Sequence, residues 1–103
     1  MKIINEIIEY FDFEKVHKAM KALDWKWNDS NQENKVPTIG HVVSVAKDQL
    51  IAAYDHIKVS KSKEYCTGTG GFRIEGFYNP VDNQIWLQLE FVISEWESAV
   101  CLN

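Results

Sequence analysis

The chain is poor in the residues that mark specialised classes of protein. Among its 103 residues are only 2 cysteines and 2 prolines, and Arg73 is the single arginine. Cys66 and Cys101 are too few for a disulfide framework, which favours free thiols and a cytoplasmic location. A secretory signal is absent, and no run approaches the ~20 apolar residues that span a bilayer. We therefore expect a cytoplasmic protein that does not contact membranes.

The chain also lacks an excess of positive charge. Lys and Arg number 11 against 15 Asp and Glu, so the formal net charge is −4. Binding to duplex DNA or RNA requires a basic surface, which argues against a duplex nucleic acid as partner. The local group Lys58, Lys61 and Lys63 falls at the end of a predicted helix, where cations suit the helix dipole.

Spacings typical of metal sites or nucleophilic catalysis are missing as well. His41 and His56 lie on one predicted helix, about 22 Å apart at ~1.5 Å per residue, so they cannot share an ion. Neither His-x-x-x-His nor Cys-x-x-Cys occurs. Cys66 could pair with a histidine as a nucleophile, but most lone cysteines are buried small apolar residues. We predict no metal, no cofactor and no catalytic residue.

The residues that are present predict one globular domain over residues 1–103, with 46% hydrophobic and 25% charged residues. Apolar residues at helical spacing predict helices over 2–10, over 13–23 after an N-cap at Asp12, and over 39–58 after an N-cap at Thr38. One continuous helix through Asp12 is the alternative to the first two. Trp25-Lys26-Trp27 alternates as a strand does and predicts a short edge strand. The polar residues 28–35 predict a loop.

From Tyr65 onward the hydrophobic period changes to two. Two alternating runs, 72–78 and 85–93, flank the turn 79–83 and predict an antiparallel hairpin. Helices followed by such strands indicate an α+β fold. We expect two layers: the N-terminal helices and one long helix packed on a small antiparallel sheet that includes a C-terminal β-hairpin.

The alternation also assigns side chains to the two faces of this hairpin. Phe72, Ile74 and Tyr78 share one face, whereas Phe77 and Trp86 fall on the other. If the helices cover one face only, the exposed aromatic residues would form a surface for a partner or for a homodimer. The alternative is that the N-terminal helices cover this second face too.

The most unusual stretch is Thr67-Gly68-Thr69-Gly70-Gly71. Its glycines either mark a bend, or make room for a large side chain such as Trp25, Trp27 or Trp86. Alternatively they let a ligand approach the backbone, whose N–H groups would form an anion-binding nest. Arg73 either pairs with Glu90 across the strands or binds a phosphate or carboxylate. The candidate residues for binding a ligand or partner are Thr67, Gly68, Thr69, Gly70, Gly71, Arg73 and Trp86.

Four short motifs are distinctive: Phe11-Asp12-Phe13-Glu14-Lys15-Val16-His17-Lys18, Trp25-Lys26-Trp27, Val36-Pro37-Thr38 and Thr69-Gly70-Gly71-Phe72. With these motifs the chain resembles a group of small uncharacterised bacteriophage and prophage proteins, and the similarity spans most of residues 10–96. The resemblance implies an intracellular accessory protein made during infection. It implies no particular activity.

Together these features favour a non-enzymatic accessory binding protein of phage type. It would occupy a host protein or sequester a small anionic ligand, a nucleotide being one candidate. Two alternatives stay open: a homodimeric structural or assembly module, and a small enzyme that uses Cys66, a histidine or Arg73.

Overall fold

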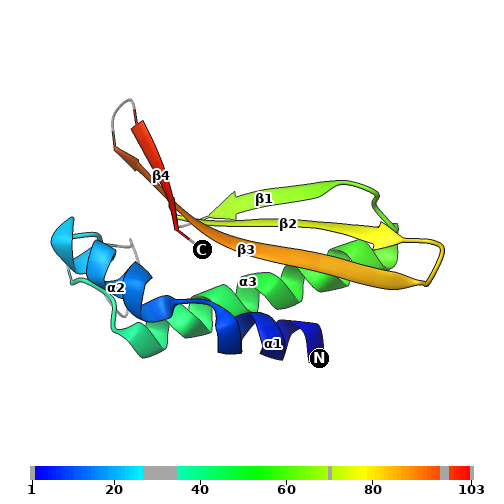
Figure 1. Ribbon diagram of the computed structural model, residues 1–103, viewed down its shortest axis with the longest axis horizontal. Helices are drawn as coiled ribbons and strands as arrows, with labels where there is room; N and C mark the ends of the chain where they lie inside the picture. The colour runs from blue at the N-terminus through cyan, green and yellow to red at the C-terminus, as the bar shows by residue number, and fades with distance from the viewer. Residues whose placement is uncertain (1, 27–34, 70, 96–97, 103) are drawn as a thin grey trace.

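Three helices lie in one layer against a single antiparallel sheet in the computed structural model, which describes residues 2–26, 35–69, 71–95 and 98–102 (Figure 1). The sheet has four strands in the order β1-β2-β3-β4, each paired with its neighbour in sequence. The predicted two-layer α+β class is confirmed. The elements are α1 (Lys2–Tyr10), α2 (Phe13–Ala22), α3 (Ile39–Ser60), β1 (Tyr65–Thr69), β2 (Phe72–Asn79), β3 (Gln84–Glu95) and β4 (Ser98–Leu102).

Both predicted helix caps are present. Asp12 accepts a hydrogen bond of 3.0 Å from the Lys15 N–H at the start of α2. The Thr38 hydroxyl accepts one of 3.2 Å from the His41 N–H at the start of α3. Each side chain satisfies an N–H that the first turn of a helix leaves without a partner. α3 ends at Lys61, which adopts the left-handed conformation (φ 53°).

The core lies between the two layers. One stripe of α3, one side each of α1 and α2, and the facing side of β2 and β3 are buried together. The residues are Ile4, Phe13, Val16, Met20, Val42, Ala46, Leu50, Ala53, Phe72, Ile74, Leu89 and Phe91. The rings of Phe72 and Phe91 meet edge to face, with centroids 5.2 Å apart. The three helices therefore cover one face of the sheet.

The predicted hairpin is confirmed, with Phe72 opposite Phe91 and Phe77 opposite Trp86. The sheet is larger than this hairpin on both sides. The period-two run from Tyr65 is two strands, because the chain reverses at Gly71, where φ is +95°. The C-terminal residues form β4, which pairs with the end of β3.

The predicted edge strand at Trp25-Lys26-Trp27 is wrong for the two residues of it that are described. Asp24 turns the chain with φ +51°, and neither Trp25 nor Lys26 belongs to a strand. Trp25 instead packs its ring edge to face on Phe91, with centroids 5.7 Å apart. Burying the indole against the sheet competes with strand pairing, and burial prevails. Trp27 and most of the predicted loop 28–35 lie outside the described residues.

Candidate functional site

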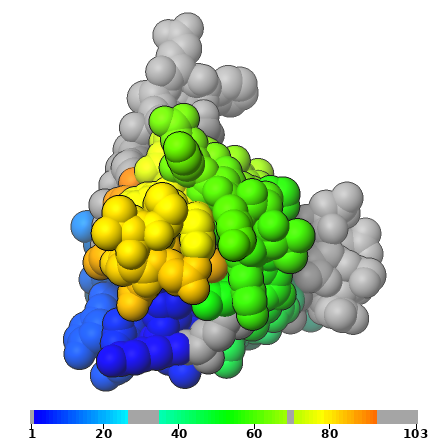
Figure 2. Space-filling model, turned by 90° about the vertical axis from the view of Figure 1, so that its right-hand side faces the viewer, coloured from blue at the N-terminus to red at the C-terminus, as the bar shows by residue number. Residues whose placement is uncertain are grey.

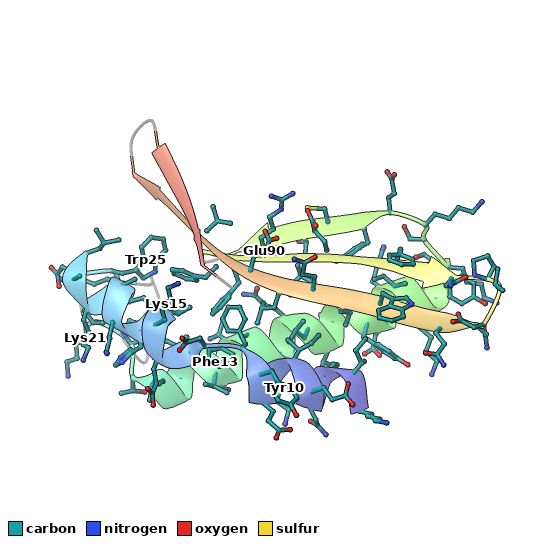
Figure 3. All side chains as sticks on the ribbon, in the orientation of Figure 1. Tyr10, Phe13, Lys15, Lys21, Trp25 and Glu90 are labelled. Carbon is teal, nitrogen blue, oxygen red and sulfur yellow. The ribbon has the colours of Figure 1, made fainter. Side chains whose placement is uncertain are left out.

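The face of the sheet that turns away from the helices is the main candidate site. We call it the open face, formed by alternate residues of three strands: Cys66 and Gly68 of β1; Arg73, Glu75 and Phe77 of β2; and Trp86, Gln88 and Glu90 of β3. Figure 3 shows Glu90 rising from the sheet on the side opposite the helix layer that carries Tyr10 and Phe13. The sequence left open whether helices cover this face. Within the described residues, they do not.

Two aromatic residues form the apolar part of the open face. Phe77 and Trp86 are direct cross-strand partners, and their rings stack with centroids 6.5 Å apart and planes 17° apart. Phe77 is 42% exposed and Trp86 is 53% exposed. Beside them is a hollow of about 720 Å³. Its lining comes from Lys63, Glu64, Tyr65, Cys66, Glu75, Gly76, Phe77, Trp86, Leu87 and Gln88.

A charged cluster occupies the next part of the open face. Arg73 pairs with Glu75 on its own strand, and its Nη1 lies 4.0 Å from Glu90 Oε2 on the neighbouring strand. The predicted Arg73–Glu90 pairing is confirmed. A hydrogen bond to Cys66 and the charges of Glu75 and Glu90 raise the pKa of the Arg73 guanidinium above its ordinary value. An incoming phosphate would have to compete with two carboxylates for this guanidinium.

The glycine-rich stretch separates into residues with different surroundings. A Cβ on Gly71 would lie 2.7 Å from Phe91 Cε1 and 3.1 Å from Trp25 Cζ2, so Gly71 makes room for these rings. The prediction that a glycine here accommodates a tryptophan is confirmed for Trp25. A Cβ on Gly68 would meet only the Phe72 carbonyl oxygen, at 3.5 Å. Packing therefore accounts for Gly71 and leaves Gly68 unexplained.

The predicted binding residues fall in two places. Thr67, Gly68, Gly71 and Arg73 line one hollow of about 430 Å³, although Thr67 pairs with Ile74 and only Gly68 and Arg73 are cross-strand partners on the open face. Trp86 is opposite Phe77, four residues along β2 from Arg73, or roughly 14 Å at ~3.4 Å per residue. Thr69 is the last residue of β1, and Gly70 lies outside the described residues.

The histidines and Cys66 do not assemble a catalytic group within the described part of the chain. His17 donates through Nε2 to the Pro37 carbonyl oxygen at 2.9 Å and so ties α2 to the segment before α3. The His56 ring packs on Tyr65, with centroids 4.8 Å apart, whereas Cys66 is exposed on the other face of β1. The expectation that Cys66 is buried is wrong, because the helices leave its face uncovered.

Among the described residues, no group of three or more His, Cys, Asp or Glu side chains is arranged to hold a metal ion. Sequence reasoning placed Phe77 on the same face as Trp86 but left it out of the candidate binding residues. It also left out Glu75 and Gln88, which line the same hollow. The period-two alternation that assigned Trp86 to this face contains the signal for all three.

No protein-family model matches the chain, and neither a curated protein nor a solved structure is significantly similar to it. The resemblance to phage proteins therefore stays a prediction. In the described helices, no segment is both long and apolar enough to cross a membrane.

Proposed function

We propose that the chain is a non-enzymatic binding protein that holds a protein partner against its open face. The observation that carries the proposal is the stacked pair Phe77 and Trp86, about half exposed on a sheet face without helices. Large exposed aromatic residues are unfavourable in water unless a partner covers them, and tryptophan is enriched among residues that dominate binding energy.

The surroundings of the pair suit a protein partner. The charged residues Arg73, Glu75 and Glu90 lie on one side of the aromatic pair, and Lys63 and Glu64 line the hollow beside it, so charged groups border an apolar centre as in other interfaces. With two cations and three anions, this border favours a partner surface that carries positive charge. If the resemblance to phage proteins reflects descent, this partner is a host protein.

A small ligand is the less favoured occupant. The hollow of about 720 Å³ has an adequate volume, but its lining residues all come from the sheet and the connection before it. Sites for small molecules bury most of the ligand surface, which requires walls on several sides. Such a hollow accommodates a protruding side chain of a protein more readily than a free nucleotide.

The test uses the full-length protein immobilised as bait in bacterial lysate. A captured partner should bind wild type and should be lost with Phe77→Ser. The control Val81→Ser removes another exposed apolar side chain, 93% exposed in the turn after β2, and should leave capture unchanged. The same loss with both variants, or capture unaffected by Phe77→Ser, would contradict the proposal.

Two further measurements separate the alternatives. A dimer in light scattering that Phe77→Ser converts to a monomer would replace the proposal with the homodimeric module. A thermal shift on adding nucleotides that Phe77→Ser abolishes would replace it with a small-ligand site. Both measurements use the same purified proteins.

A further inference from the structure

Half of β3 is an edge of the sheet. β4 pairs with β3 only from Phe91 to Glu95, so Gln84–Glu90 has β2 on one side and no described strand on the other (Figure 1). An unpaired edge offers backbone N–H and C=O groups to any other extended chain. Proteins protect such edges or use them for binding.

The hydrogen bonds around β3 show which groups are offered. The Tyr78 N–H donates to Ser62, on the β1 side of β2, and the Val92 N–H donates to Gly71, on the β2 side of β3. Backbone groups alternate in direction along a strand, so even-numbered residues of β3 face β2. Ile85, Leu87 and Leu89 therefore direct their N–H and C=O groups toward the free side.

A groove lies beside the first part of this edge, at residues 84–87, between β3, α1 and the end of α3. It has a volume of about 970 Å³ and is lined on the apolar side by Ile3 and Ile7 of α1 and by Ile85 and Leu87 of β3. Figure 2 shows α1 (blue), the β2–β3 turn (yellow to orange) and the end of α3 (green) at this end of the molecule. An added strand would thus find backbone partners on β3 and an apolar surface on α1.

The groove is positively charged at the end where β3 begins. Lys2 starts α1, Lys58 lies in the last turn of α3 and Lys61 is its C-cap, and all three line the groove. The one anion in the lining is Glu6, whose Oε1 is 3.9 Å from Lys2 Nζ. Three cations against one anion give this end a net charge of +2, in a chain whose net charge is −4.

We propose that the free edge of β3 binds an extended segment of a partner protein that ends in acidic residues or a C-terminal carboxylate. A strand antiparallel to β3 has its C-terminal end where β3 begins, beside Lys2, Lys58 and Lys61. Its carboxylates meet the lysines, and its alternate apolar side chains pack on Ile3, Ile7 and Leu87. A parallel strand would instead bring its N-terminal positive charge to the lysines.

A second copy of the chain fits this edge less well. Figure 2 shows α1 reaching sideways past the β2–β3 turn on the side of β3. Two β3 edges paired about a twofold axis would lie about 4.8 Å apart, with both copies of α1 on the same face. Packed helices need about 8–10 Å between their axes, so this pairing would have to accommodate two copies of α1 side by side. A single extended segment brings no second α1 to the edge.

The first test selects ligands for the purified protein from a random library of peptides of about eight residues with free C-termini, enough to span the edge at ~3.3 Å per residue. Selected peptides should alternate apolar residues and carry acidic residues at the C-terminal end. Lys58→Glu with Lys61→Glu should weaken their binding at least about tenfold. Lys18→Glu with Lys47→Glu, an equal charge change at exposed positions outside the groove, should leave it unchanged. Selection of basic or uncharged C-termini would overturn the proposal.

The second test addresses strand addition itself. Ile85→Pro removes an N–H that faces the free side and leaves the β2 ladder intact, so it should weaken peptide binding about tenfold, whereas Ile85→Val should not. Circular dichroism checks that the variants fold. N-methylation of the peptide tests the same contact independently of how the protein variants fold. Methylation of the alternate residues whose N–H groups face β3 should abolish binding, and methylation of the other alternate residues should leave it unchanged. Equal binding of both methylated peptides would overturn the proposal, as would a wild-type dimer that Ile85→Pro dissociates.

This inference does not depend on the proposed function of the open face. Trp86 and Leu87 line both the groove and the hollow on the open face, so the tests use residues that line only one of them. Phe77 lines the hollow alone, and Ile85 and Lys58 line the groove alone. Loss of partner capture in Phe77→Ser with retained peptide binding would support the open face alone as the lysate partner's site. The two proposals can therefore fail separately.

Discussion

Replacing Gly71 by alanine should destabilise the protein strongly, because two separate effects act at this position. Gly71 has a φ of +95°, a conformation that costs a residue with a Cβ about 1–2 kcal/mol. The added Cβ would also lie 2.7 Å from Phe91 Cε1, and Phe91 is fully buried. Overpacking a core in this way adds about 1–3 kcal/mol.

The sum, about 2–5 kcal/mol, is a large part of the 5–15 kcal/mol that stabilises a typical domain. A domain of this size loses about 4–8 °C in Tm per kcal/mol, so Gly71→Ala should melt at least about 8 °C below wild type. Urea unfolding monitored by tryptophan fluorescence should give the same order of stability, with a lower midpoint for Gly71→Ala.

Gly68→Ala is the matched control in the same stretch. The new methyl group would meet only the Phe72 carbonyl oxygen, at 3.5 Å, and alanine is favoured over glycine inside a strand by ~0.5–1 kcal/mol. We expect a Tm equal to or slightly above that of wild type. The reasoning is refuted if Gly71→Ala melts within about 2 °C of wild type, or if Gly68→Ala loses as much stability. If Gly68→Ala folds normally, it also becomes the appropriate variant for testing whether the glycine-rich stretch binds a ligand.

Three further predictions concern stability and exposure. Gly76→Ala should lower the free energy of unfolding in urea by more than about 2 kcal/mol, because the new Cβ would lie 2.6 Å from the Trp86 carbonyl oxygen. A decrease below about 0.5 kcal/mol would contradict this geometry. Thr38→Ala should lower the free energy of unfolding by about 1 kcal/mol, because the α3 cap is lost. Thr38→Ser keeps the hydroxyl and should retain the stability of the wild type. Cys66 is exposed, so in a Cys101→Ser background a thiol reagent should modify Cys66 in the native protein as fast as in the unfolded chain. Protection of Cys66 in the native protein would show that the open face is covered.

Local patterns were sufficient for the helices and for the central hairpin. Asp12 and Thr38 are cap residues whose side chains act within three residues, so their roles can be predicted from neighbouring sequence alone. The alternation in β2 and β3 likewise predicts the pairing of Arg73 with Glu90, because cross-strand register follows from the turn between the strands.

The local sequence pattern was insufficient where contacts with residues far away in the chain determine the structure. Trp25 alternates with Trp27 as a strand residue would, but its indole packs on Phe91, which is 66 residues away in the chain. At Gly71 the sequence left two interpretations open, a ligand loop or room for a large side chain, and the structure supports the second, because the fold brings Phe91 and Trp25 against this glycine. The sequence also could not tell how the candidate binding residues are grouped: Gly68 and Arg73 line one hollow and Trp86 lines another.

The sequence by itself determined the fold class, the helix starts, and which side chains share each face of the strands, because hydrophobic period and capping act over a few residues. Only the tertiary structure decided that the helices cover one face of the sheet and leave Phe77 and Trp86 in solvent. It also decided that β4 stops opposite Phe91 and leaves Gln84–Glu90 as an edge beside α1. Both features depend on contacts between segments that are far apart in the sequence, so a local sequence pattern does not predict them.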